Sequence, residues 1–409
     1  MIPRLKPYLD ARELLALLQA GGGAVERFEQ AFAREFGARH AIAFSYGRSA
    51  LYALFKALGF AGHEIVLPAY TCSVVAHAVV LSGNVPRFVD ATLDDYNMDL
   101  DRLRDAINER TRAVIATHLY GYAMNVDRLR EIVAAAERTY GNKILVIQDC
   151  AHAFGARWNG ERVCNAPDVA LFGLNISKMM TSIFGGMLTT DDDALAARVR
   201  EYRDGNFREA GPAKALARRL YLAAVYVAFM PWFYRVVRWL QRHSAILDRF
   251  TKAYHLDDRI HFPPDALDRM LPVEARVGLV QLAKYGQIER RRIEAARRYD
   301  ILLRDRIRGT LPPLRDGATY SHYAIRVRNR DALIAAAAER GVELGELIEY
   351  SVPHLESYRS AAQGEFPVSL LCSQSMINLP VFADLGDDDV TKITAVVAEI
   401  LGQGEGGAL

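Results

Sequence analysis

Short apolar runs alternate with amphipathic stretches along the N-terminal part of this chain, and this alternation constrains the fold more than any other feature. The strand-like runs are residues 41–44, 64–67, 86–89, 113–117, 144–148 and 169–173. The helix-like stretches include residues 24–36, 48–58, 73–82 and 126–137. This pattern predicts an α/β fold with a large, mostly parallel sheet covered by helices. Because such sheets bind ligands beyond the carboxyl ends of their strands, functional residues are expected in the turns that follow.

The C-terminal part follows a different pattern. Residues 320–327 and 377–382 resemble strands, whereas residues 331–340 and 387–401 resemble helices. This part is therefore predicted to form a small α+β domain. The expected division of the chain is a large α/β domain at 1–205, an apolar and basic helical insertion at 206–266, a connecting helix at 267–300 and the small domain at 301–409.

The overall charge excludes some classes of partner. The chain has 51 basic and 49 acidic residues, a net charge of +2, which gives no general attraction for nucleic acid. Its four cysteines, at positions 72, 150, 164 and 372, have no spacing typical of a disulfide framework, and the histidines have no metal-ligand spacing. The first residues lack the apolar run of a signal peptide. We therefore expect a cytoplasmic protein without a metal site.

Lys178 is the first candidate for chemistry. It follows the apolar run 169–173 and a short polar turn that ends at Ser177. A lysine among apolar neighbours loses hydration of its charge, so its pKa falls and it becomes nucleophilic toward an aldehyde. The alternative is an ordinary surface lysine on a loop.

Asp149 ends another apolar run, and His152 follows three residues later. A carboxylate among apolar residues needs a cationic partner to stay ionised, and a protonated pyridine nitrogen would be one. The alternative for Asp149 is the N-cap of a following helix. His152 would lie one helical turn away on the same face, or would be a packed core histidine.

Gly47, Arg48 and Ser49 connect the first strand-like run to a helix-like stretch. Glycine allows a tight turn, and the free N–H groups at a helix start can bind phosphate. An ordinary helix N-cap explains the same residues nearly as well.

Residues 220–240 are strongly apolar and aromatic, and Asp248 is the only acid within 212–252. A transmembrane span is excluded, since it would place the two halves of one α/β domain on opposite sides of a bilayer. Two alternatives stay open for this segment. It forms a helical hairpin in the membrane interface, or it packs as an extra helix or a dimer contact that buries Trp232, Phe233 and Trp239.

An ordered series of segments resembles the DegT/StrS-type sugar aminotransferases of the fold-type I superfamily, which use pyridoxal 5′-phosphate (PLP). The segments are residues 47–59, 64–90, 96–107, 118–127, 148–160, 172–178, 185–190 and 269–282. The resemblance implies that Lys178 binds PLP covalently and moves a proton, and that Asp149 pairs with the pyridinium nitrogen. It also implies that His152 approaches the phenol oxygen and that Arg48 and Ser49 contact the phosphate. Gly47, Cys72 and Ser177 complete the expected cofactor site. The expected partners are a ketosugar, an amino-acid donor such as glutamate, and a second copy of the chain.

Several positions depart from the family pattern, including Arg48 in place of a common threonine and Glu349-Tyr350-Ser351 in place of a histidine-tyrosine-proline stretch. Gly173 replaces a serine that commonly touches the phosphate, Cys72 replaces an aromatic residue beside the cofactor ring, and Leu267 replaces an asparagine that reaches the partner subunit. Cofactor binding is expected to survive, so the favoured function is transamination of a nucleotide- or lipid-linked ketosugar for polysaccharide or glycolipid synthesis. The alternatives are a catalytically inactive scaffold and a PLP enzyme with another reaction outcome.

Overall fold

The computed structural model describes residues 1–409 except 166–167, 231–232, 235–258, 308–310 and 403–409. A seven-stranded sheet forms its large part, with the strand order β1-β9-β8-β5-β4-β2-β3. The strands are β1 (His40–Phe44), β2 (Glu64–Pro68), β3 (Val85–Val89), β4 (Thr111–Thr117), β5 (Leu145–Asp149), β8 (Val169–Gly173) and β9 (Gly186–Thr190). Only β9 runs antiparallel to its neighbours, β8 and β1. The expected mostly parallel sheet is therefore confirmed.

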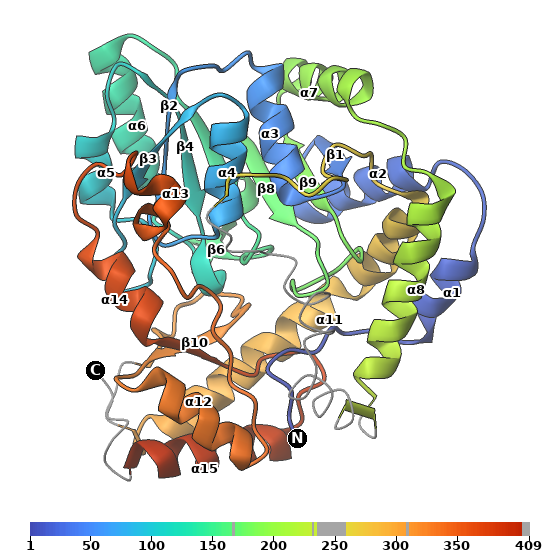
Figure 1. The fold of residues 1–409 in the computed structure, drawn as a ribbon, viewed down its shortest axis with the longest axis vertical. Coiled ribbons are helices and arrows are strands. Elements are labelled where there is room, and N and C mark those ends of the chain that lie inside the picture. The colour runs from blue at the N-terminus through green and yellow to red at the C-terminus, as the bar shows by residue number, and fades with distance from the viewer. Residues whose placement is uncertain (166–167, 231–232, 235–258, 308–310, 403–409) are drawn as a thin grey trace.

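Helices cover both faces of the sheet (Figure 1). Successive side chains of a strand point to opposite sides, so apolar strand residues are buried against helices on each face. The helices over one face are α3 (Gly47–Ala57), α4 (Ser73–Leu81) and α7 (Asp193–Asn206). Those over the other face are α2 (Ala24–Phe36), α5 (Leu100–Ala106) and α6 (Val126–Tyr140). In β2, for example, Ile65 and Leu67 pack beneath α3 and α4, while Val66 faces α5 and α6.

A 32-residue helix, α11 (Pro272–Leu303), runs from the sheet to the C-terminal part of the chain (Figure 1). That part holds the antiparallel pair β10 (Tyr323–Arg326) and β11 (Met376–Leu379), shorter than the strands expected there. Its helices are α12 (Arg330–Glu339), α13 (Glu356–Arg359), α14 (Pro367–Ser375) and α15 (Asp387–Gly402). Other short elements include α1 (Ala11–Leu18), β6 (Arg157–Trp158), β7 (Glu161–Arg162) and the 3-10 helices η1 (Leu119–Gly121), η2 (Val163–Asn165) and η3 (Val352–His354).

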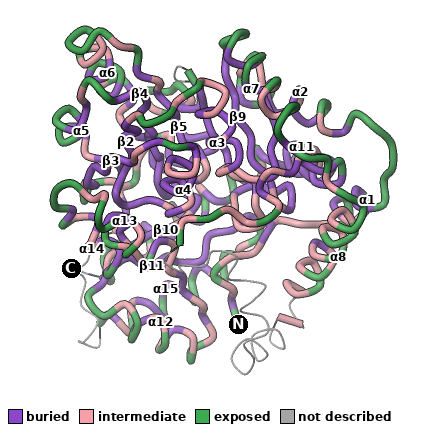
Figure 2. Tube along the Cα trace, turned by 45° about the horizontal axis from the view of Figure 1, so that its top comes forward, coloured by how far each residue is buried: buried purple, intermediate pink, exposed green. Residues whose placement is uncertain are grey.

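The predicted insertion begins with helix α8 (Pro212–Ala228), which packs beside α1 and α11. Pro212 occupies the first turn of α8, where a missing N–H costs no hydrogen bond. Much of α8 is half-buried or exposed (Figure 2). Within the part of the chain that the structure describes, no helix is both long and apolar enough to cross a membrane. One of the two alternatives for this segment buries Trp232, Phe233 and Trp239. Phe233 is half-buried, whereas Trp232 and Trp239 lie outside the described residues.

Candidate active site

A pocket opens at the carboxyl ends of the parallel strands, the edge at which ligands were expected. Thr117 and Asp149 end β4 and β5, and Gly173 ends β8. The turn after β1 contributes Gly47 and Arg48. Since β9 is antiparallel, its first residue lies at this same edge, and Gly185 just before it also lines the pocket.

The pocket brings together six of the eight residues that the sequence singled out: Gly47, Arg48, Cys72, Asp149, His152 and Lys178. The other two lie beside it. The Ser49 side chain is buried within the first turn of α3, and the Ser177 Oγ donates to Asn175 Oδ1 at 2.6 Å. Ser177 therefore stabilises the turn before Lys178, whereas Asn175 itself lines the pocket. The assignment of these residues to a cofactor stays a prediction.

Lys178 lies on the pocket wall and is only partly exposed. Burial lowers the pKa of its ammonium group, because the surrounding protein replaces water; Cys72 and Asp149 oppose this shift. The aliphatic chain of Lys178 passes Gly173, where an added Cβ would lie 3.5 Å from Lys178 Cε. A lysine in this setting keeps a larger share of its amine uncharged than a solvated lysine does.

Asp149 is buried, and burial raises the pKa of its carboxyl group. The hydrogen bonds that it accepts come from neutral groups, the Ala151 N–H at 3.1 Å and the Thr117 hydroxyl at 3.4 Å. The neighbouring Lys178 charge also favours the ionised form of Asp149. These contacts stabilise the Asp149 carboxylate only in part. A cationic group of a ligand in the pocket would stabilise its ionised form further.

The chain after Asp149 forms turns and no helix, so the alternative that Asp149 caps a helix is wrong, as is the expectation that His152 lies one helical turn away. The Ala153 N–H donates to Cys150 O at 2.9 Å, and this bend directs His152 into the pocket. Burial, helped by the charge of Lys178, holds the pKa of His152 well below its ordinary value, so the imidazole is neutral. Its Nδ1 has no hydrogen-bond partner within the described residues.

The C-terminal part adds a residue that the sequence analysis missed. His322 lies next to β10, and its ring centroid is 5.4 Å from that of His152. Burial, with the charges of Arg292 and Lys178, lowers the pKa of His322 well below its ordinary value. A second missed residue, Tyr46, precedes Gly47 and lines the pocket. Neither residue is part of a sequence pattern that would have identified it.

The start of α3 has the features of an anion site. No side chain caps this helix, so the N–H groups of its first turn, at Gly47, Arg48 and Ser49, are oriented toward its open end. The Ser49 hydroxyl is buried without a hydrogen-bond partner in the described part of the chain. An added Cβ at Gly186 would lie 2.4 Å from Gly47 N, so only glycine lets β9 approach this turn.

Comparisons with known proteins agree with this geometry. The model of the DegT/DnrJ/EryC1/StrS aminotransferase family matches residues 11–221 and 236–398. The chain belongs to this family. The internal residues left unmatched, 222–235, fall within the apolar segment of the predicted insertion.

Similar members of the DegT/DnrJ/EryC1/StrS family come from several bacteria. The spore coat polysaccharide biosynthesis protein SpsC of Bacillus subtilis is 26% identical over 96% of this chain and 94% of its own length. The GDP-perosamine synthase of Caulobacter vibrioides is also 26% identical, over 98% and 99%. Among solved structures, the Helicobacter pylori aminotransferase PseC has a TM-score of 0.77 at 20% identity, over 98% of this chain and 99% of that one. This last likeness supports the fold.

Members of the DegT/DnrJ/EryC1/StrS family are PLP-dependent aminotransferases, so the expected enzyme class and cofactor are confirmed. The pocket fits PLP: Lys178 would hold its aldehyde carbon, Asp149 its ring nitrogen, and the start of α3 its phosphate. PLP supplies an electron sink that allows a proton to leave the carbon bearing the amino group. Lys178, in its uncharged form, would accept that proton and return it at another carbon. Neutral His152 can donate a hydrogen bond without adding charge.

Proposed function

We propose that this aminotransferase converts a nucleotide- or lipid-linked ketosugar to an aminosugar, with an amino acid such as glutamate as the donor. The observation that carries this proposal is the convergence of Lys178, Asp149 and His152 on one pocket at the sheet edge. The names of the relatives support the substrate class, since they include a GDP-perosamine synthase and a UDP-4-amino-4-deoxy-L-arabinose–oxoglutarate aminotransferase. The product would enter polysaccharide or glycolipid synthesis.

An absorbance spectrum of the purified protein, before and after glutamate, tests the proposal. The wild-type protein should show a visible band of lysine-bound PLP that bleaches with glutamate, because the cofactor takes up the amino group. Lys178→Ala should lose the lysine-bound form and the turnover. Failure of the wild-type protein to take up PLP when it is supplied would instead favour the inactive scaffold. Product analysis with and without the donor separates transamination from another outcome on the sugar.

We also propose that α8 makes a peripheral contact with a membrane, as befits a lipid-linked precursor. Leu216, Leu220 and Val227 are 55%, 61% and 39% exposed, and their spacing places them on one face of α8. Lys214 and Arg218 are engaged in ion pairs on the inner face of α8. The later basic residues of 212–252, Arg235, Arg238, Arg242, Arg249 and Lys252, still outnumber the single acid, which favours an anionic surface. The protein would act on the cytoplasmic side of that membrane.

Co-sedimentation with vesicles tests the membrane contact. The wild-type protein should pellet with vesicles that contain anionic lipid, and the double variant Leu216→Ser/Leu220→Ser should remain in the supernatant. Leu93→Ser, at another exposed leucine, is the matched control and should pellet like the wild-type protein. A wild-type protein that stays in the supernatant with anionic vesicles would contradict the contact.

A further inference from the structure

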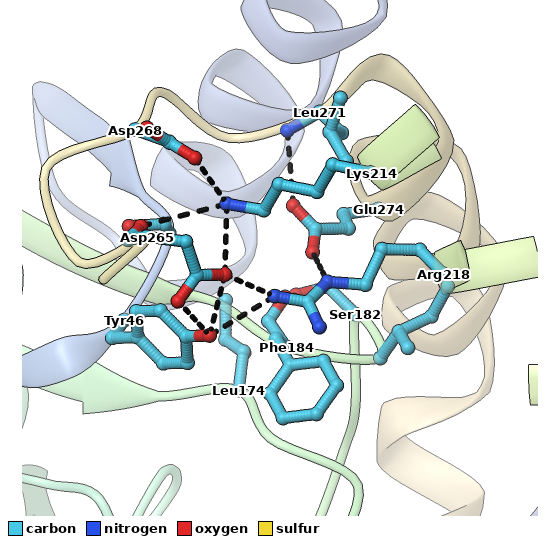
Figure 3. Close-up of polar contacts among 12 residues, drawn as sticks. Tyr46, Leu174, Ser182, Phe184, Lys214, Arg218, Asp265, Asp268, Leu271 and Glu274 are labelled. Carbon is cyan, nitrogen blue, oxygen red and sulfur yellow. Dashed lines mark hydrogen bonds and ion pairs between the residues drawn. The ribbon is translucent and has the colours of Figure 1, made fainter. Parts of the chain in front are cut away.

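Two basic side chains on the inner face of helix α8, Lys214 and Arg218, contact residues outside this helix (Figure 3). Arg218 Nη2 lies 2.8 Å from Asp265 Oδ2 and donates to Tyr46 Oη at 3.0 Å. Arg218 Nε lies 3.0 Å from Glu274 Oε1, on α11. One turn earlier, Lys214 Nζ is 3.0 Å from Asp265 Oδ2. A single guanidinium group thus connects α8, α11 and the turn before α3.

This network is largely removed from water. The Arg218 side chain is 14% exposed and that of Glu274 is 1% exposed. Burial raises the pKa of Glu274 to about 7, and the charge of Arg218 opposes that rise. Because charges in such a place are stable only when they are paired, the loss of one partner leaves the others uncompensated. The loss of any one of these charged groups is therefore expected to displace the others.

Tyr46 connects the network to the cofactor pocket. Its hydroxyl donates to the Asp265 carboxylate at 2.9 Å and accepts from Arg218. Its ring lies beside the pocket, with the Arg48 guanidinium carbon 5.5 Å from the ring centroid. Tyr46 is also the residue directly before α3, whose N–H groups form the expected phosphate site. A displacement of Tyr46 would therefore move that site.

Arg218 also contacts Phe184, whose ring packs against that of Tyr46 at 5.9 Å between centroids. Its guanidinium lies 3.9 Å from the centroid of the Phe184 ring, a cation–π contact (Figure 3). Phe184 precedes Gly185, which lines the pocket, and belongs to the loop that carries Lys178 to β9. Tyr221, one turn along α8, packs on the same ring at 5.2 Å between centroids.

We propose that Arg218 is a positioning residue for the cofactor pocket, which holds the phosphate turn through Tyr46 and the end of the lysine loop through Phe184. The affinity for PLP then depends on the contacts of Arg218 with Tyr46 and Phe184. Lys178 and the start of α3 belong to segments far apart in the chain, and Arg218 contacts a neighbour of each. This role requires PLP binding but not a particular sugar substrate.

Titration of the full-length apo protein with PLP, followed by absorbance, tests this role. Arg218→Gln should raise the dissociation constant for PLP about tenfold and reduce the rise in melting temperature that PLP causes. Arg218→Lys should restore only part of the affinity, because an ammonium group lacks the planar fork that contacts several partners. Arg219→Gln is the matched control. Arg219 is on the same helix but donates to Leu17 O of α1 at 2.9 Å, so the affinity should be unchanged.

Tyr46→Phe completes the test, because it removes only the hydroxyl and is expected to fold even if Arg218→Gln does not. It should weaken PLP binding several-fold, and the double variant should be little weaker than Arg218→Gln alone. An unchanged PLP affinity in Tyr46→Phe, or single effects that multiply in the double variant, would overturn the proposal. So would equal losses of melting temperature in the apo and PLP-bound forms of Arg218→Gln with the affinity intact.

Discussion

Gly173 shows how one residue changes the pocket without closing it. It ends β8 and lines the pocket where family members commonly have a serine. An added Cβ would lie 3.5 Å from both Ala151 Cβ and Lys178 Cε, which is ordinary van der Waals contact. The site therefore has room for a small side chain and lacks only its hydroxyl group.

We expect Gly173→Ser to tighten PLP binding, since one hydrogen bond to a charged group contributes about 1.5–3 kcal/mol. Gly173→Ala is the matched control, because it adds the Cβ without a hydroxyl, and its affinity should stay near that of the wild-type protein. Titration of the apo protein with PLP measures both. A serine variant that binds no more tightly than the alanine variant would show that the phosphate lies elsewhere.

The lowered pKa of Lys178 leads to a prediction on pH. Since only the uncharged amine attacks an aldehyde, the rate of covalent PLP uptake should rise with pH and level off above the pKa of Lys178. The midpoint should lie below 10.5, the ordinary value for lysine. Stopped-flow absorbance of the apo protein gives this profile, and Nα-acetyl-lysine serves as the reference. A midpoint equal to that of the reference would show that burial does not lower the pKa of Lys178.

The sequence predicted the residues suited to the chemistry better than the residues that surround them in the pocket. Lys178 and Asp149 were identifiable because they follow apolar strands, and strand ends converge in a parallel sheet. Tyr46 was not identified, because its hydrogen-bond partners Asp265 and Arg218 are remote in the chain. His322 was missed for the same reason, as it reaches His152 only through the packing of the C-terminal part against the sheet.

At the scale of elements, β9 and the loop before it were the main omission. Residues 185–190 begin with two glycines, which weaken a strand in isolation. Here Gly186 is needed because β9 passes against the backbone of Tyr46 and Gly47. Packing against a remote segment therefore outweighed local propensity. The helices were found more readily, since α2, α3 and α6 have long periodic patterns.

The loop before β9 contains a conformation that its sequence does not favour. Ile183 has φ of 75°, a left-handed conformation that is strained for a β-branched residue. Its side chain is fully buried in a cluster with Leu17 of α1, Leu222 of α8 and Val277 of α11. Burial of an isoleucine contributes about 2–5 kcal/mol, more than the roughly 1–3 kcal/mol of such strain. The cluster therefore maintains the strained loop.

This balance predicts an unusual order of stability. Ile183→Ala should lower the free energy of unfolding by about 2–5 kcal/mol, because it loses the burial and keeps the strain. Ile183→Gly loses the same contacts but adopts φ of 75° freely, so it should be no less stable than Ile183→Ala. Urea denaturation of the apo proteins measures both. A glycine variant clearly less stable than the alanine variant would show that the backbone at Ile183 is not strained.

At the scale of the whole molecule, we propose a homodimer, as membership of the family suggests. The chain has a mass of 45.6 kDa, so light scattering coupled to size exclusion should give about twice that value. The measurement should be made at several protein concentrations. A mass that remains at the monomer value throughout would contradict the proposal.

The pairing of β9 with β1 has a consequence for the order in which segments of the chain fold during synthesis. In the described sheet, β1 is an edge strand, and its neighbour is β9, more than a hundred residues later in the chain. The turn at Gly47 is synthesised early, whereas Gly186, which packs against its backbone, follows more than a hundred residues later. Contacts between such distant segments form slowly. During synthesis, the parallel strands can assemble around β4 and β5 first, and the phosphate site is completed only after the lysine has been made. A nascent chain that ended between Lys178 and β9 would carry Lys178 without the complete pocket whose burial lowers the pKa of its amine.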